Sequence, residues 1–268
     1  MEKLDAPIAV GFTAEIFAWR DGFVLKLFKQ GRSRRSVEYE AHLSRIVHAT
    51  GLPVPAVGDI VEVEGRYGLE LERVDGPSML EVLMRKPWMV PKYARQLAEL
   101  QAEMHTRQVP ELPSQNEMLV HKITQAERLP GNVRQAALSA VYKFPVEDKL
   151  CHGDFHPGNI LLTRRGPVII DWIDASRGSP VMDVARSSLL FGGGRIPSSI
   201  PRAWLVNLFQ KPLYDIYLRR YFQLNQIDRQ QFDRYIPVAA AARIDENIYF
   251  DETRLLAIAQ SVLLQVDE

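Results

Sequence analysis

The feature that most constrains the fold is a change of hydrophobic pattern at residues 75–77, Asp-Gly-Pro. Before this break, short apolar runs are separated by the turn signals Asp-Gly at 21–22 and Glu-Gly at 64–65, which predict β-hairpins. After it, apolar residues recur at helical spacing, as in residues 93–107. The sequence therefore predicts a small β-rich lobe followed by a larger helical lobe, with the boundary near residues 72–77.

Length and composition limit the classes of function. The 268 residues are 46% hydrophobic and 25% charged, which suffices for one large domain or two lobes. Thirty-three basic residues balance 33 acidic ones, so the chain has no electrostatic signature of binding to nucleic acid or to an anionic membrane. The single cysteine, Cys151, excludes a disulfide framework, and neither a signal peptide nor a membrane-spanning run is evident. These features predict a soluble cytoplasmic protein and leave its oligomeric state open.

The regular elements follow from turn and capping signals. Strands are expected at 16–20 and 23–28, and a helix at 33–50 begins at Ser33 or Ser36 and is ended by Gly51 and Pro53. Later in the chain, two strands flank a turn at Arg165 and Gly166. The other expected elements are strands within 57–74, at 159–163 and at 167–173, and helices at 135–144, 181–191, 202–224 and 251–266.

Lys26 is a charged side chain in an otherwise apolar strand, FVLKLF. Side chains alternate along a strand, so Lys26 shares one face with Val24 and Phe28, and the other face is wholly apolar. A buried ammonium group needs a partner of opposite charge. The strand alone leaves equally open the alternative that Lys26 lies at the strand edge and extends its amino group to solvent.

Glu40 is the candidate partner of Lys26. It lies three positions before Leu43 and seven before Val47, on the apolar stripe of its helix, whereas Glu38 does not. A carboxylate on the buried face of a helix beside a strand with a buried lysine predicts an ion pair. The alternative is that Glu40 lies at the rim of the stripe and is solvated.

A dense polar stretch, CHGDFHPGNILL, occupies residues 151–162. It contains Asp154 and Asn159, five positions apart, and Asp171 follows at the end of the apolar run VIID. One carboxylate as general base, with an amide and a second carboxylate as oxygen ligands, is what metal-assisted phosphoryl transfer needs, because Mg²⁺ takes hard oxygen ligands and keeps several waters. In this interpretation Asp154 accepts the proton of an acceptor hydroxyl, and Asn159 and Asp171 bind Mg²⁺.

The order of these residues resembles that of the kinases, which use a strand lysine, a helix glutamate, a catalytic loop and a metal-binding aspartate. The triplet His-Gly-Asp at 152–154 and the stretch FHPGNILL resemble the aminoglycoside phosphotransferase and choline-kinase-like family. The segments LAELQAEMH (97–105) and IIDWIDASRGSPVMDVAR (169–186) resemble it too, and the similarity extends over roughly residues 8–190.

This resemblance implies an α+β, bilobal, protein-kinase-like fold. Residues 1–74 would form a small antiparallel β lobe with one main helix, which binds nucleotide. Residues 75–268 would form a larger, mostly α-helical lobe for catalysis and acceptor binding. The resemblance also implies ATP as phosphoryl donor, with GTP as an alternative, and Mg²⁺ as cofactor.

Carried over by position, the family's roles fall on the residues already singled out. Asp154 resembles the catalytic base, and Asn159 and Asp171 resemble the metal ligands. Lys26, oriented by Glu40, resembles the residue that holds the α- and β-phosphates.

Three further sets of residues gain roles from the same resemblance. Residues 11–15, with Gly11 and Thr13, resemble the loop over the phosphates, although the loop has one glycine where GxGxxG has three. Glu72 to Val74 resembles the hinge that hydrogen-bonds the nucleotide base through its backbone, and Asp183 resembles the structural aspartate that supports the catalytic loop. His152 is expected to hold that loop by bonding to its backbone.

Two other chemistries remain as alternatives for the polar stretch. The pattern HxDxH, from His152 to His156, could bind a transition metal, although Pro157 and Gly158 prevent a helix that would gather the side chains. Cys151 beside His152 could suggest a nucleophile pair, but neighbours on a strand point to opposite faces. A buried structural thiol is the favoured interpretation of Cys151.

The acceptor is the least constrained part of the prediction. Only twelve positions separate Asp171 from Asp183, and this short link favours a small molecule over a peptide. A protein kinase, an adenylyl transferase and an inactive nucleotide-binding pseudokinase stay as alternatives. After residue 201, nine acidic residues face eight basic ones, which does not favour a polycation, although 245–252 is locally acidic. An aminoglycoside, an amino alcohol, a sugar and an amino acid are all left open.

Overall fold

A computed structural model describes residues 4–11, 13–192, 194, 202–246 and 251–265. Its contacts divide the chain into two compact units. The first consists of Met1–Ser78 and Asn159–Ile173, and the second of Met79–Gly158 and Asp174–Glu268. The expected division at residue 74 thus differs from the compact units in two ways: the boundary lies after Ser78, and 159–173 group with the N-terminal residues.

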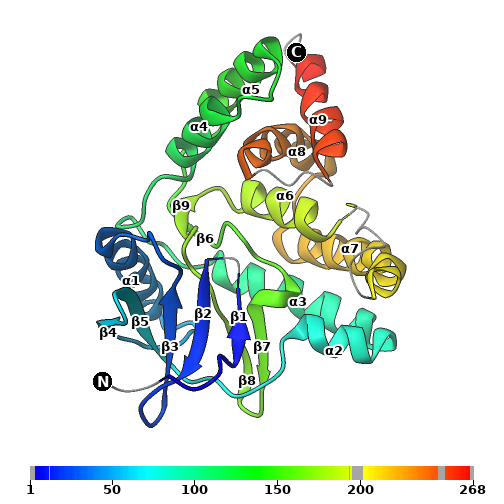
Figure 1. The fold of residues 1–268 in the computed structure, drawn as a ribbon. Coiled ribbons are helices and arrows are strands. Elements are labelled where there is room, and N and C mark those ends of the chain that lie inside the picture. Colours follow the sequence, from blue (N-terminus) through cyan, green and yellow to red (C-terminus); the bar gives the residue numbers. More distant parts are fainter. Residues whose placement is uncertain (1–3, 12, 193, 195–201, 247–250, 266–268) are drawn as a thin grey trace. The chain divides into compact units, whose positions relative to one another are not determined.

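The first unit is built on a five-stranded antiparallel sheet in the order β1-β2-β3-β5-β4 (Figure 1). Both predicted hairpin turns are present. Glu64 and Gly65 have φ angles of 52° and 72°, as a tight two-residue turn requires, and Gly22 has a φ of 78°. The strands are β1 (Ala9–Val10), β2 (Ala14–Ala18), β3 (Phe23–Phe28), β4 (Val57–Val63) and β5 (Arg66–Glu72).

One helix, α1 (Arg34–Ala49), packs on this sheet. It begins where the sequence predicted, because the Ser33 hydroxyl accepts a hydrogen bond from the Ser36 N–H at 3.2 Å. It ends at Thr50, and Gly51 follows with a φ of 76°, a left-handed conformation that glycine adopts without cost.

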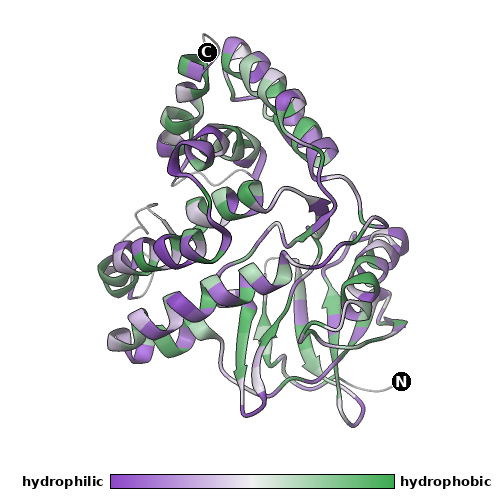
Figure 2. Ribbon diagram, turned by 180° about the vertical axis from the view of Figure 1, so that it is seen from behind, coloured by the Kyte–Doolittle hydropathy of each residue, from purple (hydrophilic) through white to green (hydrophobic). Residues whose placement is uncertain are grey.

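Strand β3 is buried on both faces. Its Phe28 packs with Val37 and Ala41 of α1, and its Leu25 and Leu27 pack on the opposite side of the sheet. Figure 2 shows the hydrophobic residues that run along these central strands. Because side chains alternate along a strand, Lys26 shares the α1 face with Phe28.

The hairpin of β7 (Ile160–Thr163) and β8 (Gly166–Ile169) explains why 159–173 belong to the first unit. Ser78 forms a β-bridge with Leu161, and the Leu162 N–H donates to the Pro77 carbonyl at 2.9 Å. The N–H of Ile169 donates to the carbonyl of Pro53, also at 2.9 Å.

The second unit is mostly helical. Helix α3 packs along α7, and α8 contacts α4, α5, α6 and α9 (Figure 1). A short antiparallel pair, β6 (Lys149–Cys151) and β9 (Ser176–Gly178), lies beside α6 and α4. The helices are α2 (Met79–Arg85), α3 (Val90–Met104), α4 (Gln115–Gln125), α5 (Gly131–Lys143), α6 (Pro180–Phe191), α7 (Ala203–Asn225), α8 (Arg229–Arg243) and α9 (Glu252–Gln260).

Short 3-10 turns complete the described elements, at Pro87–Met89, Pro157–Asn159, Ile244–Glu246 and Ser261–Gln265. The last of these replaces the end of the helix predicted at 251–266. Across the described part of the chain, no helix is long and apolar enough to cross a membrane.

Candidate active site

Lys26 lies between two carboxylates in the first unit. Its Nζ is 2.6 Å from Glu40 Oε1 and 2.9 Å from Asp171 Oδ1. Lys26 is 9% exposed and Glu40 4%, so the predicted ion pair is present and buried. The contact with Asp171 was not foreseen, because the two residues are 145 positions apart.

The charges of this cluster are not fully balanced by one cation. Burial acts to lower the pKa of Lys26, but the charges of Asp171 and Glu40 outweigh it, so the pKa is raised and the ammonium group stays charged. Burial raises the pKa of Glu40 above its usual value even though Lys26 opposes this effect. Two carboxylates thus share one ammonium group.

Asn159 and Asp171 lie at the same end of the β7–β8 hairpin. Ile160 pairs with Ile169, and the Ile170 N–H donates to the Asn159 carbonyl at 3.0 Å, which extends the pairing by one position. Asp171 follows directly, with a φ of 67°. Such a left-handed conformation is uncommon outside glycine and often occurs at functional sites.

The residues expected to contact the nucleotide all lie in the first unit. Gly11 forms a tight turn between β1 and β2, in which its N–H donates to the Ala14 carbonyl at 2.8 Å. The Thr13 carbonyl accepts from Lys29, and Glu72 ends β5 with its N–H bonded to the carbonyl of Ala56. Val74 follows β5 and is half-buried.

The loop predicted to be catalytic lies in the second unit, after β6. His152 is fully buried, and its Nδ1 accepts a hydrogen bond from the Asp154 N–H at 3.2 Å, so it holds the loop backbone as the sequence predicted. His156 Nε2 is 3.6 Å from the Asp154 carboxylate. Burial acts to raise the pKa of Asp154, but His156, Arg186 and His152 outweigh it and hold that pKa well below its usual range.

Helix α6 holds both backbone groups of Gly153. Asp183 Oδ1 accepts the Gly153 N–H at 2.8 Å, and the Arg186 Nε donates to the Gly153 carbonyl. Gly153 has a φ of 77°, and a Cβ there would lie 2.5 Å from the Asp174 carbonyl oxygen. Asp183 thus contacts the loop as the sequence predicted, whereas Arg186 was not among the predicted residues.

A buried polar network, also not foreseen, fixes the Asp183 side chain. Its Oδ2 accepts from Gln101 Nε2 at 2.8 Å and lies 3.1 Å from His105 Nε2. The Tyr217 hydroxyl donates to Gln101 Oε1, and His105 Nδ1 is hydrogen-bonded to the Tyr221 hydroxyl. The family-like segment at 97–105 contains Gln101 and His105 and was the only sequence signal for this network.

The alternative chemistries gain no support from the geometry. The Nδ1 atoms of His152 and His156 each accept a backbone N–H, from Asp154 and Gly158. Among the described residues, no group of three or more His, Cys, Asp or Glu side chains is placed to hold a metal. Cys151 is fully buried, and burial raises the pKa of its thiol well above the usual value, as for a structural cysteine.

One unit is built on an antiparallel β-sheet and the other is mostly helical, and the protein has a protein-kinase-like α+β fold. The chain belongs to the phosphotransferase enzyme family (APH), whose sequence pattern matches residues 6–235. No curated protein sequence matches the chain.

Solved structures agree on the fold. A thermostable mutant of aminoglycoside phosphotransferase APH(4)-Ia has a TM-score of 0.65 at 16% identity, over 98% of this chain and 94% of that chain. ADP-bound APH(2'')-Ib has a TM-score of 0.60 at 17% identity, over 97% and 93%. A choline/ethanolamine kinase family protein from Mesorhizobium loti has a TM-score of 0.62 at 15% identity, over 99% and 90%. At these sequence identities, the similarity shows the fold and does not show the substrate.

Proposed function

We propose that this phosphotransferase moves the γ-phosphoryl group of ATP, or of GTP, to a hydroxyl group of a small molecule. The observation that supports this most is the buried Lys26, with Glu40 at 2.6 Å and Asp171 at 2.9 Å. A scaffold gains little from a buried Lys26–Glu40 pair, because the desolvation of both groups is costly, and the carboxylate of Asp171, which is exposed, faces the same ammonium group. The structural relatives include APH(4)-Ia in a complex with ADP and hygromycin B.

The first unit would bind the nucleotide. Lys26, oriented by Glu40, would hold the α- and β-phosphates as a fixed positive charge. The turn with Gly11 and Thr13 would cover the phosphates, and the backbone from Glu72 to Val74 would hydrogen-bond the base.

Asn159 and Asp171 fit a Mg²⁺ ion that arrives with the nucleotide. Both offer oxygen donors, and both lie at one end of the β7–β8 hairpin. Mg²⁺ accepts a site with few protein ligands because it retains water and takes phosphate oxygens. When bound, the ion would neutralise charge on the phosphates.

Asp154 would orient the acceptor hydroxyl and take its proton. The His152 side chain fixes its backbone N–H, and α6 fixes Gly153 before it, so the carboxylate starts from an ordered loop. The low pKa of Asp154 means that it is ionised at neutral pH and ready to accept a hydrogen bond from the hydroxyl.

The chain between Asp171 and Asp183 supports a small acceptor. It contains only the three-residue strand β9 and the start of α6. A peptide substrate would need a longer segment as a docking surface.

The experiment is a panel of hydroxyl acceptors, in which nucleotide release is measured with the wild-type protein and with Asp154→Asn. We expect release of ADP that depends on one class of acceptor and on Mg²⁺. Release of pyrophosphate would indicate an adenylyl transferase. Transfer to a protein substrate would indicate a protein kinase, and tight nucleotide binding without turnover would indicate a pseudokinase.

We predict that Asp154→Asn lowers kcat by roughly two to four orders of magnitude, as loss of a general base does. The dissociation constant for ATP with Mg²⁺ should stay within about twofold, because Asp154 is not among the proposed nucleotide contacts. Titration calorimetry and single-turnover kinetics measure the two quantities. Turnover close to that of the wild type would contradict the role of Asp154.

A further inference from the structure

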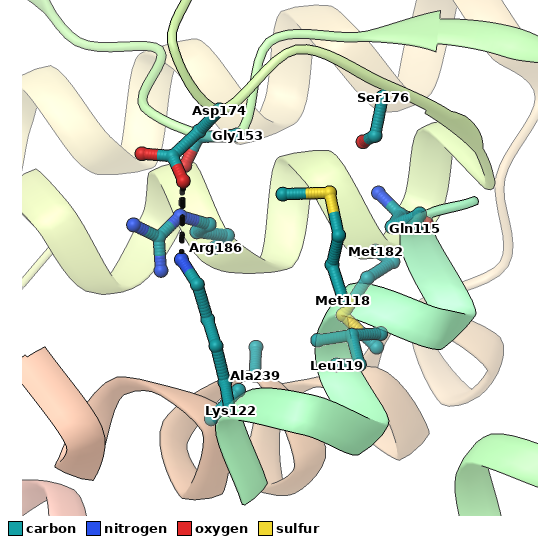
Figure 3. Close-up of a pocket in the computed structure, with 11 residues that line it drawn as sticks. Gln115, Met118, Leu119, Lys122, Gly153, Asp174, Ser176, Met182, Arg186 and Ala239 are labelled. Atoms are coloured by element: carbon teal, nitrogen blue, oxygen red, sulfur yellow. Dashed lines mark hydrogen bonds and ion pairs between the residues drawn. The ribbon is translucent and has the colours of Figure 1, made fainter. Parts of the chain in front are cut away.

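A small hollow lies in the second unit, beside the residue that precedes the proposed base. Gly153 forms part of its wall, and its volume is about 40 Å³. Most of the remaining wall is apolar and comes from α4, α6 and α8: Met118, Leu119, Met182, Ala239 and Ala242. Figure 3 shows the Met118 and Met182 side chains beside the charged residues of the rim.

Asp174 lines this hollow, and Glu246 pairs with two other lining residues, Lys122 and Arg186; both carboxylates are thus paired with cations of the protein itself. Lys122 Nζ lies 3.2 Å from Asp174 and 3.7 Å from Glu246, and Figure 3 shows it extending from α4 toward Asp174. Arg186 also forms an ion pair with Glu246, and Arg243 Nε is 3.2 Å from the same carboxylate. Three cations therefore face Asp174 and Glu246, and one of them, Arg186, also acts on a third carboxylate, that of Asp154.

These ion pairs keep Glu246 in its charged form. Burial acts to raise the pKa of Glu246, but Arg186, Arg243 and Lys122 outweigh it and lower that pKa. The three charged groups that act most strongly on Glu246 are thus all cations. The hollow therefore has no excess of negative charge to offer a cationic ligand.

Two other carboxylates of the acidic segment 245–252 are also paired with cations. Asp251 forms an ion pair with Arg254 at 2.6 Å, and Glu252 forms one with Arg128 at 3.0 Å. A segment that is acidic in sequence thus presents few uncompensated carboxylates in the fold.

We infer that the acceptor of the proposed phosphoryl transfer is an uncharged alcohol, which places an apolar group against Met118, Leu119 and Met182. An ammonium group at this hollow would meet Lys122 and Arg186, or would have to displace one of them from its carboxylate. An apolar group gains by leaving water and breaks no ion pair. The inference rests on the proposed function and adds the class of the acceptor.

Methyl NMR tests the inference directly by binding. The protein is labelled with ¹³C at the methionine methyl groups, and the Met118 and Met182 signals are assigned with Met118→Leu and Met182→Leu. Butanol and aminobutanol serve as matched probes that differ by one ammonium group, and hygromycin B serves as a polycation. We expect butanol to shift both signals and the two cationic probes to shift them much less at the same concentration.

A charge variant supplies the second arm. Lys122→Gln releases Asp174 and Glu246 from one cation, so the affinity for aminobutanol should rise by roughly threefold to fivefold, the worth of a partly exposed ion pair. The affinity for butanol should stay the same. Lys211→Gln is the matched control, because Lys211 also pairs with a carboxylate, Asp215 at 2.7 Å, but does not line the hollow.

Two outcomes would overturn the inference: cationic probes that shift the methionine signals more than butanol does, or no shift with any probe. Binding of ATP with Mg²⁺ and acceptor-dependent ADP release are measured on the same samples. If these succeed while the methionine signals favour the cations, only the class of the acceptor is wrong. If both nucleotide measurements fail, the proposed function itself is wrong.

Discussion

At the scale of single residues, replacement of Lys26 gives the clearest test of the ion pairs in the first unit. It neutralises two carboxylates at once, and Glu40 is almost fully buried, with 5% of its side chain exposed. Lys26→Met would leave Glu40 buried without its closest cation. Loss of one partner of a buried pair costs about 3–5 kcal/mol, whereas loss of both partners costs much less than twice that amount.

We therefore predict that Lys26→Met and Glu40→Gln are non-additive. Their coupling should be about 1–3 kcal/mol in the free energy of unfolding, measured by urea denaturation. Arg34→Met with Glu38→Gln is the control cycle, because that pair lies in the same helix but is exposed. Its coupling should stay below about 1 kcal/mol. A Lys26–Glu40 cycle that adds without coupling would mean that the two residues do not act as a unit.

His156 is predicted to set how far into acid the enzyme stays active. Burial acts to raise the pKa of Asp154, and His156 supplies the largest opposing effect. In the proposed mechanism the ionised carboxylate is the active form, so activity should be present above the pKa of Asp154 and be lost as pH falls through it. His156→Gln should raise this pKa and move the acid limb of the kcat/KM profile to higher pH.

His121→Gln is the matched control for that profile, because His121 is exposed on α4 and is not among the groups that lower the pKa of Asp154 most. The wild type and this control should show no acid limb from Asp154 above its ordinary pKa of 3.8. An acid limb that stays in place in His156→Gln would contradict the effect of His156 on the base.

At the scale of elements, the loop that follows β6 depends on the absence of a side chain at Gly153. Gly153 and Gly22 have nearly the same φ, 77° and 78°, but a Cβ at Gly153 would lie 2.5 Å from the Asp174 carbonyl oxygen, whereas nothing lies within 4 Å at Gly22. Alanine at either position adopts an unfavourable backbone conformation, at a cost of about 1–2 kcal/mol.

We predict that only Gly153→Ala also displaces the catalytic loop. It should lower kcat at least tenfold, because a displacement of about 1 Å can cost two orders of magnitude in rate. Gly22→Ala should lower stability by a similar backbone cost and leave kcat unchanged. Thermal unfolding and steady-state kinetics on the two variants measure this difference. Equal kinetic losses would show that backbone strain alone explains the effect.

Elements set by local signals were predictable from the sequence. The Ser33 cap, the turn at Glu64 and Gly65, and the buried position of Glu40 each depend on residues a few positions apart. Helix α4 also has a local start signal, because the Ser114 hydroxyl accepts the Glu117 N–H at 3.5 Å. The contact of its Lys122 with Asp174, 52 positions away, has no such signal.

The parts of the candidate site that sequence patterns missed depend on long-range contacts. The Lys26–Asp171 pair and the Gln101–Asp183 bond join segments 145 and 82 positions apart. Hydrophobic periodicity says which side of a helix is buried, but it does not say which buried polar side chain meets which other. The helical pattern therefore gives no partner for Gln101 or His105, and the fold shows that both lie beside Asp183.

At the scale of the whole molecule, the proposed nucleotide contacts and the proposed base fall in different compact units. Lys26, Glu40, Asn159 and Asp171 belong to the first unit, and Asp154 belongs to the second. We predict that AMP-PNP with Mg²⁺ slows amide hydrogen exchange in residues 13–78 and 159–173. Asp154→Asn should show the same protection, and Lys26→Met should show little. Protection confined to the second unit would contradict this assignment.

The first unit is assembled from two pieces of sequence, and this limits how the protein can be recombined with its relatives. A chimaeric gene with one junction anywhere from residue 79 to 158 would take Lys26 and Glu40 from one parent and Asn159 and Asp171 from the other. Exchange of an intact first unit requires three junctions, near residues 78, 158 and 173. In most chimaeras from a library built with single junctions, Lys26 and Asp171 would therefore come from different parents.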